Sequence, residues 1–293
     1  MASGQILEAN GLTKTIGGHR ILKGLDFNVY RGQVIGLLGK NGAGKSTLMD
    51  VLLGFAIPTG GSCRVFGEDS ARMRASTKAR IGFVPQSDEL MGLMTGAQHL
   101  ALAASFYDNW NKELVQRLAS DWQVPLDRRA GAMSGGERQK LATLMALGHR
   151  PELLVMDEPA SGLDPVARRQ FMRTILDIAS DTSRAILYSS HIVGDIERTA
   201  SHIWMMREGE LVWRGELDQL KESVVRLQIR AAQTIDPALK LPGLLDLSVF
   251  GCTATATLRD WQPSRLAELE RLTGADIEVE PLGLEDIFLA VQA

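Results

Sequence analysis

The sequence predicts an α/β protein with a mostly parallel central sheet, followed by a small C-terminal domain of α+β type. Three observations support this fold class. A glycine-rich loop joins an apolar strand to a helix at residues 33–53. Short apolar runs then alternate with helical stretches at 153–206, which is the pattern of parallel strands joined by helical crossovers. From about residue 222 the pattern changes to short strands with few helices.

Three short strands and one helix are expected at the start of the chain, where apolar runs are bounded by turn residues. In the helix, Leu48, Val51 and Leu52 fall on one face, and Gly54 supplies the stop. The expected elements are strands at 5–8, 25–30 and 33–38 and the helix at 45–53.

The next region, at about 88–150, is predicted to be mainly helical. Leu114, Val115, Leu118 and Trp122 recur there at helical spacing. The chain then returns to alternating elements and closes with a hairpin at 203–213. These elements are strands at 153–156, 185–189 and 203–206 and helices at 171–179 and 193–200. We therefore place the main domain at 1–221, with its helical subdomain at about 88–150.

The C-terminal domain is expected at 222–293. Asp236-Pro237 and Leu241-Pro242-Gly243 mark loops inside it. Its expected elements are strands at 224–229, 245–250, 253–258 and 277–279 and helices at 265–272 and 284–291. No residue pattern in this domain indicates chemistry.

Composition excludes several classes of protein. The chain has 293 residues, of which 45% are hydrophobic, enough for one large domain and a small one. A net charge of −3 argues against a protein that coats nucleic acid, so no nucleic-acid partner is expected. Cys63 and Cys252 are expected to be free thiols. The first ten residues do not resemble a signal peptide, and no apolar run approaches the ~20 residues of a membrane span.

A phosphate-binding loop is predicted where the chain reads Gly39-Lys40-Asn41-Gly42-Ala43-Gly44-Lys45-Ser46. Glycines let backbone N–H groups approach phosphate oxygens, and the following helix adds its positive N-terminal end. Lys45 is expected to reach the β- and γ-phosphates of ATP, and the Ser46 hydroxyl to ligate Mg²⁺.

Two carboxylates follow the apolar strand at 153–156. Asp157 is expected at the carboxyl end of that strand, where ligands bind in open α/β sheets. It would hold Mg²⁺ through water, and Glu158 would polarise the attacking water. The motif follows the phosphate loop by about 110 residues, a pairing that favours nucleotide hydrolysis.

A second anion-binding helix start is predicted at Ser134, Gly135 and Gly136. One nucleotide cannot easily touch two such helix starts within one chain. We therefore expect a head-to-tail pair of chains, in which this start lies over the partner's γ-phosphate.

These motifs and their order, from residue 4 to about 220, resemble the ATP-binding-cassette (ABC) family. The resemblance implies a P-loop NTPase cassette with an antiparallel β subdomain and a helical subdomain. It also implies a coupling glutamine at Gln86, an inter-subunit loop at Asp164 and a γ-phosphate contact at His191. The expected catalytic residues are Glu158, His191 and Lys45, and the expected metal-binding residues are Ser46, Gln86 and Asp157. The expected nucleotide-binding residues are Gly39, Asn41, Gly42, Ala43, Gly44, Lys45, Ser46, Thr47, Ile16, Ser134, Gly135, Gly136 and Asp164.

Three positions depart from the family pattern. Met133 replaces a leucine and Glu137 replaces a glutamine in the signature around Ser134. Ile16 stands where the family usually has an aromatic that stacks on adenine. Isoleucine offers only apolar burial there, so the sequence predicts weaker base discrimination.

The resemblance implies an ATPase that powers a separate membrane permease at the cytoplasmic face of a bacterial inner membrane. A repair or chromosome cassette would carry a large insertion between the ATP motifs, and a translation-associated protein would carry two cassettes. The tail at residues 284–289 is similar to that of exporter-type cassettes whose permease is a separate chain, although the tail by itself does not decide direction. Residues 107–110 and 189–198 resemble the branch of peptide-antibiotic resistance and envelope-stress exporters. Export is therefore favoured, and import remains the alternative. The second cassette could be a copy of this chain or a paralogue.

Overall fold

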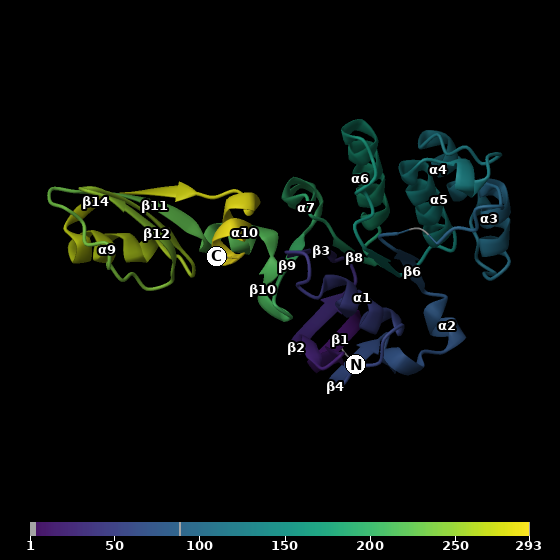
Figure 1. Cartoon of the computed structure of the whole chain (residues 1–293), viewed down its shortest axis with the longest axis horizontal. Helices are drawn as coiled ribbons and strands as arrows, with labels where there is room; N and C mark the ends of the chain where they lie inside the picture. Colours follow the sequence, from purple (N-terminus) through teal and green to yellow (C-terminus); the bar gives the residue numbers. More distant parts are fainter. Residues whose placement is uncertain (1–3, 88, 293) are drawn as a thin grey trace. The chain divides into compact units, whose positions relative to one another are not determined.

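A computed structural model describes residues 4–87 and 89–292 of the chain. The chain divides into two compact units, Met1–Trp213 and Arg214–Ala293 (Figure 1). The sequence set the boundary after residue 221, inside α8 (Leu217–Ser223), because the strand pattern changes only after that helix. The predicted domain ends at 1 and 293, and the start of the helical region at 88, lie outside the described residues.

The first unit is built on a mixed sheet whose strand order is β10-β9-β3-β8-β7-β6. β3, β6, β7, β8 and β9 run parallel. Most of their residues are buried, as expected for strands covered on both faces. The sheet confirms the predicted α/β class and the hairpin that closes it. The strands are β3 (Val34–Gly39), β6 (Ile81–Val84), β7 (Leu153–Met156), β8 (Ala185–Ser189), β9 (His202–Arg207) and β10 (Glu210–Glu216).

A second, antiparallel sheet has the order β2-β1-β4-β5. Its strands are β1 (Gln5–Ile16), β2 (His19–Tyr30), β4 (Gly60–Val65) and β5 (Glu68–Asp69). The predicted strands at 5–8 and 25–30 are therefore too short, and β4 and β5 were missed. The ladder between β1 and β2 shifts register near Gly11. The N–H of Gly11 donates to Oδ1 of Asp26 on β2. That irregularity interrupts the period of two on which the prediction depended.

Helices cover both faces of the mixed sheet. Ile35 and Leu37 of β3 join the core shared with α1, whereas the intervening Gly36 faces α7. A Cβ at Gly36 would lie 2.3 Å from Ile196, so α7 packs directly on the strand. The helices are α1 (Lys45–Leu53), α2 (Ala75–Lys78), α3 (Gly96–Ala104), α4 (Lys112–Asp121), α5 (Gly135–Leu147), α6 (Pro165–Ala179) and α7 (Val193–Thr199), with 3₁₀ turns at Ser70–Arg72 and Ala130–Ala132.

Aromatic side chains fix the helical region to the rest of the first unit. Tyr107 stacks on His149 with ring centroids 4.0 Å apart, and Trp110 stacks on Tyr107. Trp122 packs on Phe171 of α6. These three aromatics thus pack the helical region together and against α6.

The second unit is a four-stranded antiparallel sheet of order β12-β13-β11-β14 with its own apolar core. Leu227 and Ile229 of β11 lie in that core. The elements are β11 (Val225–Ala231), β12 (Leu244–Phe250), β13 (Thr253–Leu258), β14 (Ala275–Pro281), α8, α9 (Leu266–Thr273) and α10 (Leu284–Gln292), with a 3₁₀ turn at Pro263–Arg265. The predicted elements are recovered within a few residues.

Cys63 is buried and Cys252 exposed, and both are free thiols as predicted. Within the described ranges, no helix is both long enough and apolar enough to cross a membrane.

Candidate active site

The carboxyl ends of the parallel strands meet at one edge of the mixed sheet, where an open cavity of about 490 Å³ forms. The phosphate loop leaves β3, the carboxylates leave β7, and His191 follows β8. The cavity is lined by Ile21, Asn41, Gly42, Gly44, Lys45, Ser46, Thr47, Gln86, Asp157 and Glu158. Segments that are far apart in the sequence are thus brought to one place, as the motif order predicted.

The start of α1 has no side-chain cap. Its N-cap is Gly44, with φ 102°, and its first turn carries no acidic residue. A side chain would be strained in that left-handed conformation. Gly39 is constrained differently, since a Cβ there would lie 2.7 Å from the carbonyl oxygen of Met206 on β9. The helix start therefore presents backbone N–H groups and a positive dipole end to an anion.

Lys45 is the first residue of α1 and is only 8% exposed. Its Nζ donates to the carbonyl oxygens of Gly39 (2.7 Å) and Lys40 (3.3 Å). Burial lowers the pKa of Lys45, and the nearby charges of Glu158 and Asp157 oppose that shift. The ammonium is bonded to neutral carbonyls, so a phosphate oxygen is a stronger acceptor for it.

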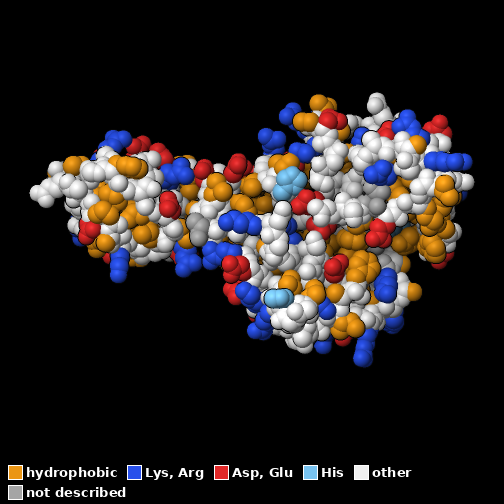
Figure 2. Space-filling view, viewed as in Figure 1, with side chains coloured by type: hydrophobic (Ala, Val, Ile, Leu, Met, Phe, Trp, Pro, Cys, Tyr) orange, Lys and Arg blue, Asp and Glu red, His pale blue; other side chains and the backbone are white. Residues whose placement is uncertain are grey.

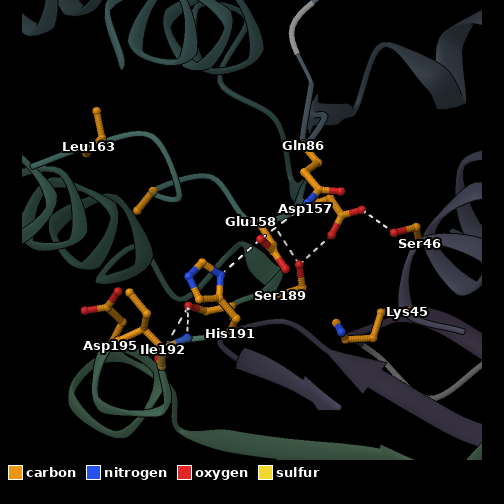
Figure 3. A network of polar contacts seen from close by, with 12 residues as sticks. Lys45, Ser46, Gln86, Asp157, Glu158, Leu163, Ser189, His191, Ile192 and Asp195 are labelled. Carbon is orange, nitrogen blue, oxygen red and sulfur yellow. Dashed lines mark hydrogen bonds and ion pairs between the residues drawn. The ribbon is translucent and has the colours of Figure 1, made fainter. Parts of the chain in front are cut away.

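A chain of hydrogen bonds joins α1, β7 and β8 (Figure 3). Ser46 Oγ donates to Asp157 Oδ2 (2.6 Å), and Ser189 Oγ donates to Asp157 Oδ1 (2.5 Å). Ser189 also accepts from the backbone N–H of Glu158 (2.8 Å). Ser189 was not predicted as a site residue because in the sequence it is only the last position of an apolar strand. Its hydroxyl lies at the carboxyl end of β8, the strand beside β7, which leads to Asp157. That position was the feature from which Ser189 could have been predicted.

The carboxylate of Glu158, which follows β7, lies between Gln86 and His191. Its Oε2 accepts from Gln86 Nε2 (3.4 Å) and lies 3.0 Å from His191 Nδ1. Its backbone has φ 47°, a left-handed conformation that costs about 1–3 kcal/mol for a residue with a side chain. The bond from its N–H to Ser189 holds that conformation. The strained backbone and the two polar neighbours together fix the direction of the carboxylate.

Ser134, Gly135 and Gly136 lie at the start of α5, outside the lining of this cavity. Ser134 Oγ accepts from the Glu137 N–H (3.2 Å), and Glu137 Oε2 accepts from the Ser134 N–H (2.7 Å). This reciprocal arrangement is a capping box. The chain therefore has a second helix start that its own phosphate loop does not reach, as the two-chain hypothesis requires.

The comparisons with known proteins decide the family. A family model described as "ABC transporter" matches residues 22–161. The chain is 31% identical over 294 residues to a Nod factor export ATP-binding protein of Cupriavidus pinatubonensis, covering 97% of this chain and 90% of that one. It is 32% identical over 219 residues to a bacitracin transport ATP-binding protein of Bacillus licheniformis, covering 74% and 72%. The chain belongs to the ABC transporter ATP-binding proteins.

A solved ATP-binding subunit of an ABC transporter matches the fold with a TM-score of 0.68 at 27% identity, over 74% of this chain and 92% of that one. The ABC resemblance stated from the motifs is confirmed, and with it the cassette fold. Proteins of this family bind ATP, which agrees with the open start of α1.

Ile16, the predicted contact for the base, lies outside the lining of the phosphate-loop cavity. Ile16 is 51% exposed at the end of β1 and does not line the cavity, whereas Ile21 of β2 does. The β1–β2 hairpin was not predicted, so the proximity of Ile21 to the phosphate loop could not be foreseen. The contact of Ile16 with adenine stays a prediction.

Asp164 is the N-cap of α6. Its Oδ1 accepts from the N–H groups of Val166 (2.9 Å) and Ala167 (3.0 Å). These hydrogen bonds lower the pKa of Asp164, and the one from Ala167 has the largest effect. The loop before it is held by Arg168, which donates to the carbonyl oxygens of Ala160 and Leu163. The inter-subunit role of Asp164 stays a prediction, while its capping role is visible in one chain.

Gln139, which was not predicted as a site residue, connects the ABC signature helix α5 to the segment of Gln86. The side chain is 5% exposed, and its Nε2 donates to the carbonyl oxygen of Pro85 (3.2 Å). Its partner, Pro85, lies 54 residues away in the sequence, so no local pattern indicated the contact. This hydrogen bond ties α5 directly to the residue that precedes Gln86.

The residues at Ser46 and Asp157 fit a magnesium ion. Their oxygens lie 2.6 Å apart beside the phosphate loop. Mg²⁺ takes oxygen ligands and is usually held by one or two protein groups together with substrate phosphates. Gln86 lies on the same cavity and can contribute its amide oxygen.

Proposed function

We propose that this chain hydrolyses Mg·ATP and that hydrolysis drives export by a separate membrane permease. The observation that carries the proposal is the carboxylate of Glu158, which lies in the phosphate-loop cavity in contact with Gln86 and His191. A general base needs this kind of position, within reach of a water beside the terminal phosphate.

The residues have separate tasks in the proposed reaction. Lys45 and the backbone N–H groups at the start of α1 bind the β- and γ-phosphates and stabilise their charge. Glu158 orients a water and takes its proton, while His191 contacts the γ-phosphate. Ser46 and Asp157 would hold Mg²⁺, which when bound neutralises charge on the phosphate oxygens. Ser189 fixes Asp157 and the backbone of Glu158 in the orientations that these tasks need.

The proposed unit is a head-to-tail pair of cassettes, either two copies or this chain with a paralogue. The support is that the start of α5 lies outside the cavity of its own chain. In the pair, Ser134 and Gly136 donate to the partner's γ-phosphate, and Asp164 lies near the join. ATP then bridges the chains, and phosphate release weakens the bridge.

The proposed permease contact lies near Gln86. Large apolar side chains are exposed on this part of the first unit, and Figure 2 shows hydrophobic side chains gathered over α3. Exposed apolar groups of this kind favour a protein contact. They are Met91 and Leu93, which follow Gln86 in the chain, Phe106, which follows α3, and Phe55, whose ring packs on Phe83 of β6. Their partner would be a permease segment at the cytoplasmic face of a bacterial inner membrane.

Export is favoured by the names of the relatives. One relative is named for Nod factor export, and another is named for bacitracin transport. The export relative aligns with 97% of this chain, which includes most of the C-terminal unit. Reconstitution with its partner permease, in vesicles of known orientation, would decide the direction.

The variant Glu158→Gln tests hydrolysis. It should bind ATP within about threefold of the native chain but lose roughly 100-fold or more of its turnover, because the base is gone and the shape remains. An ATP-held dimer should then accumulate in size-exclusion chromatography. Glu210→Gln, on an exposed strand position, is the matched control. Native turnover in Glu158→Gln would remove Glu158 from the proposed role.

A further inference from the structure

We propose that Arg128 neutralises Glu137 at the start of α5, and that this ion pair lets ATP join two cassettes across a signature that carries an extra negative charge. The inference rests on the proposed function, because the start of α5 must meet a partner's γ-phosphate. It assigns to Arg128 a role as a positioning and charge-compensating residue.

The geometry of the pair is direct. Arg128 Nη1 donates to both carboxylate oxygens of Glu137, at 3.0 and 3.2 Å. The same carboxylate accepts from the Ser134 N–H. That backbone hydrogen bond is the largest cause that lowers the pKa of Glu137, the Ser134 hydroxyl adds to it, and the charge of Arg128 lowers the pKa further, so the side chain is ionised at neutral pH.

The negative charge of Glu137 is unfavourable for anion binding at the start of α5. It lies in the first turn of α5 and occupies the Ser134 N–H, which leaves the Ser134 hydroxyl and the Gly135 and Gly136 N–H groups for a phosphate. A carboxylate there repels the γ-phosphate and offsets the positive helix end. An uncharged glutamine at this position would need no neutralising cation, whereas the Glu137 carboxylate does.

The capping box itself does not require an arginine. α3 begins with the same box, in which Thr95 Oγ1 accepts from the Gln98 N–H and Gln98 Oε1 accepts from the Thr95 N–H. Its third-position side chain is a neutral amide. A capping box with a neutral third-position side chain therefore forms in this fold. The Arg128 contact at α5 compensates the charge of Glu137 and is not needed to form the cap.

Arg128 is placed for this task by its backbone. Its N–H donates to the Pro125 carbonyl oxygen, and its own carbonyl oxygen accepts from the N–H of Gly96, each at 3.1 Å. The side chain is 49% exposed, and that of Glu137 is 25% exposed. The pair is partly solvated in one chain. It would lose water when a second cassette closes over it, so its effect should appear mainly in the dimer.

The experiment measures the ATP concentration at which half of the chain is dimeric, in the Glu158→Gln background. Arg128→Ala should raise that concentration about tenfold, and Arg128→Lys should raise it less than about threefold, since lysine keeps the charge. Binding of ATP by the monomer should stay unchanged, because the start of α1 is untouched. Arg129→Ala is the matched control, since Arg129 forms no ion pair among the described residues.

A double-mutant cycle separates charge compensation from simple propping of the helix. In a chain that also carries Glu137→Gln, Arg128→Ala should change the half-dimer concentration by less than about twofold, because no charge remains to neutralise. An equal defect in both backgrounds would overturn the proposal. So would a wild-type dimerisation curve in Arg128→Ala. If Glu158→Gln itself forms no ATP-held dimer, the proposed function fails, and not merely this inference.

Discussion

The starts of α1 and α5 are both candidate anion sites, yet they are built in opposite ways. α1 begins at Gly44 with no side-chain cap and no acidic residue in its first turn. α5 begins at Ser134 inside a capping box closed by Glu137. One start is open and backed by the buried Lys45, and the other is already satisfied by its own side chains.

The difference teaches which start can act alone. An open helix end with a buried cation binds phosphate within one chain. A capped helix end is stable without a ligand. It can therefore remain exposed to solvent in one chain and bind a nucleotide that is held by another chain. We therefore expect changes at α1 to abolish binding, and changes at α5 to spare binding and abolish association.

The largest effect is expected from Lys45→Ala at α1. Loss of the buried ammonium should weaken ATP binding by roughly 100-fold, or about 2.7 kcal/mol, as measured by equilibrium binding to the monomer. Lys40→Ala, in the same loop, should stay near the native value. Native affinity in Lys45→Ala would break the assignment of α1 as the primary site.

The next effect is expected from Ser134→Arg at α5. Monomeric ATP binding should persist, while ATP-dependent dimerisation and ATPase activity fall below about a tenth of native, because the bulky side chain blocks the partner's phosphate. Thr95→Arg removes the equivalent cap of α3 and controls for the ~1 kcal/mol that a lost cap costs. An unaffected ATPase rate in Ser134→Arg would contradict the shared site.

A smaller effect is expected from Ser189→Ala, which tests how far the α1 site depends on the neighbouring strand. The change leaves Asp157 Oδ1 without its buried donor, a loss worth about 1–3 kcal/mol. Turnover should fall about tenfold while KM changes less than threefold, since the geometry of Asp157 and Glu158 suffers more than phosphate binding. Ser190→Ala is the control. A change in KM alone would show that Ser189 serves binding instead.

The smallest effect is expected at the base end, away from both helix starts. Ile16→Tyr should raise the preference for ATP over GTP by about fivefold, through stacking worth ~1–3 kcal/mol at most. Competition between the two nucleotides measures it. In the native chain, a preference for ATP of a hundredfold or more would defeat the prediction of weak base discrimination.

Local motifs were enough to predict much of this molecule. The phosphate loop with its strand and helix, the two carboxylates and the serine-glycine helix start each carry their chemistry within a few residues. Ser189 and Gln139 escaped prediction because their partners lie 32 and 54 residues away in the sequence. The β1–β2 hairpin escaped because an irregular ladder hides the alternation of buried and exposed residues.

The sequence by itself determined the α/β class and the ABC family, and it predicted most of the candidate site residues, because glycine conformations, helix starts and strand-end carboxylates are local consequences of residue type. Only the tertiary structure decided that Ser46, Asp157 and Ser189 form one hydrogen-bonded chain. It also decided that Arg128 meets the carboxylate of Glu137, since this pairing depends on how the chain packs and no local pattern encodes it.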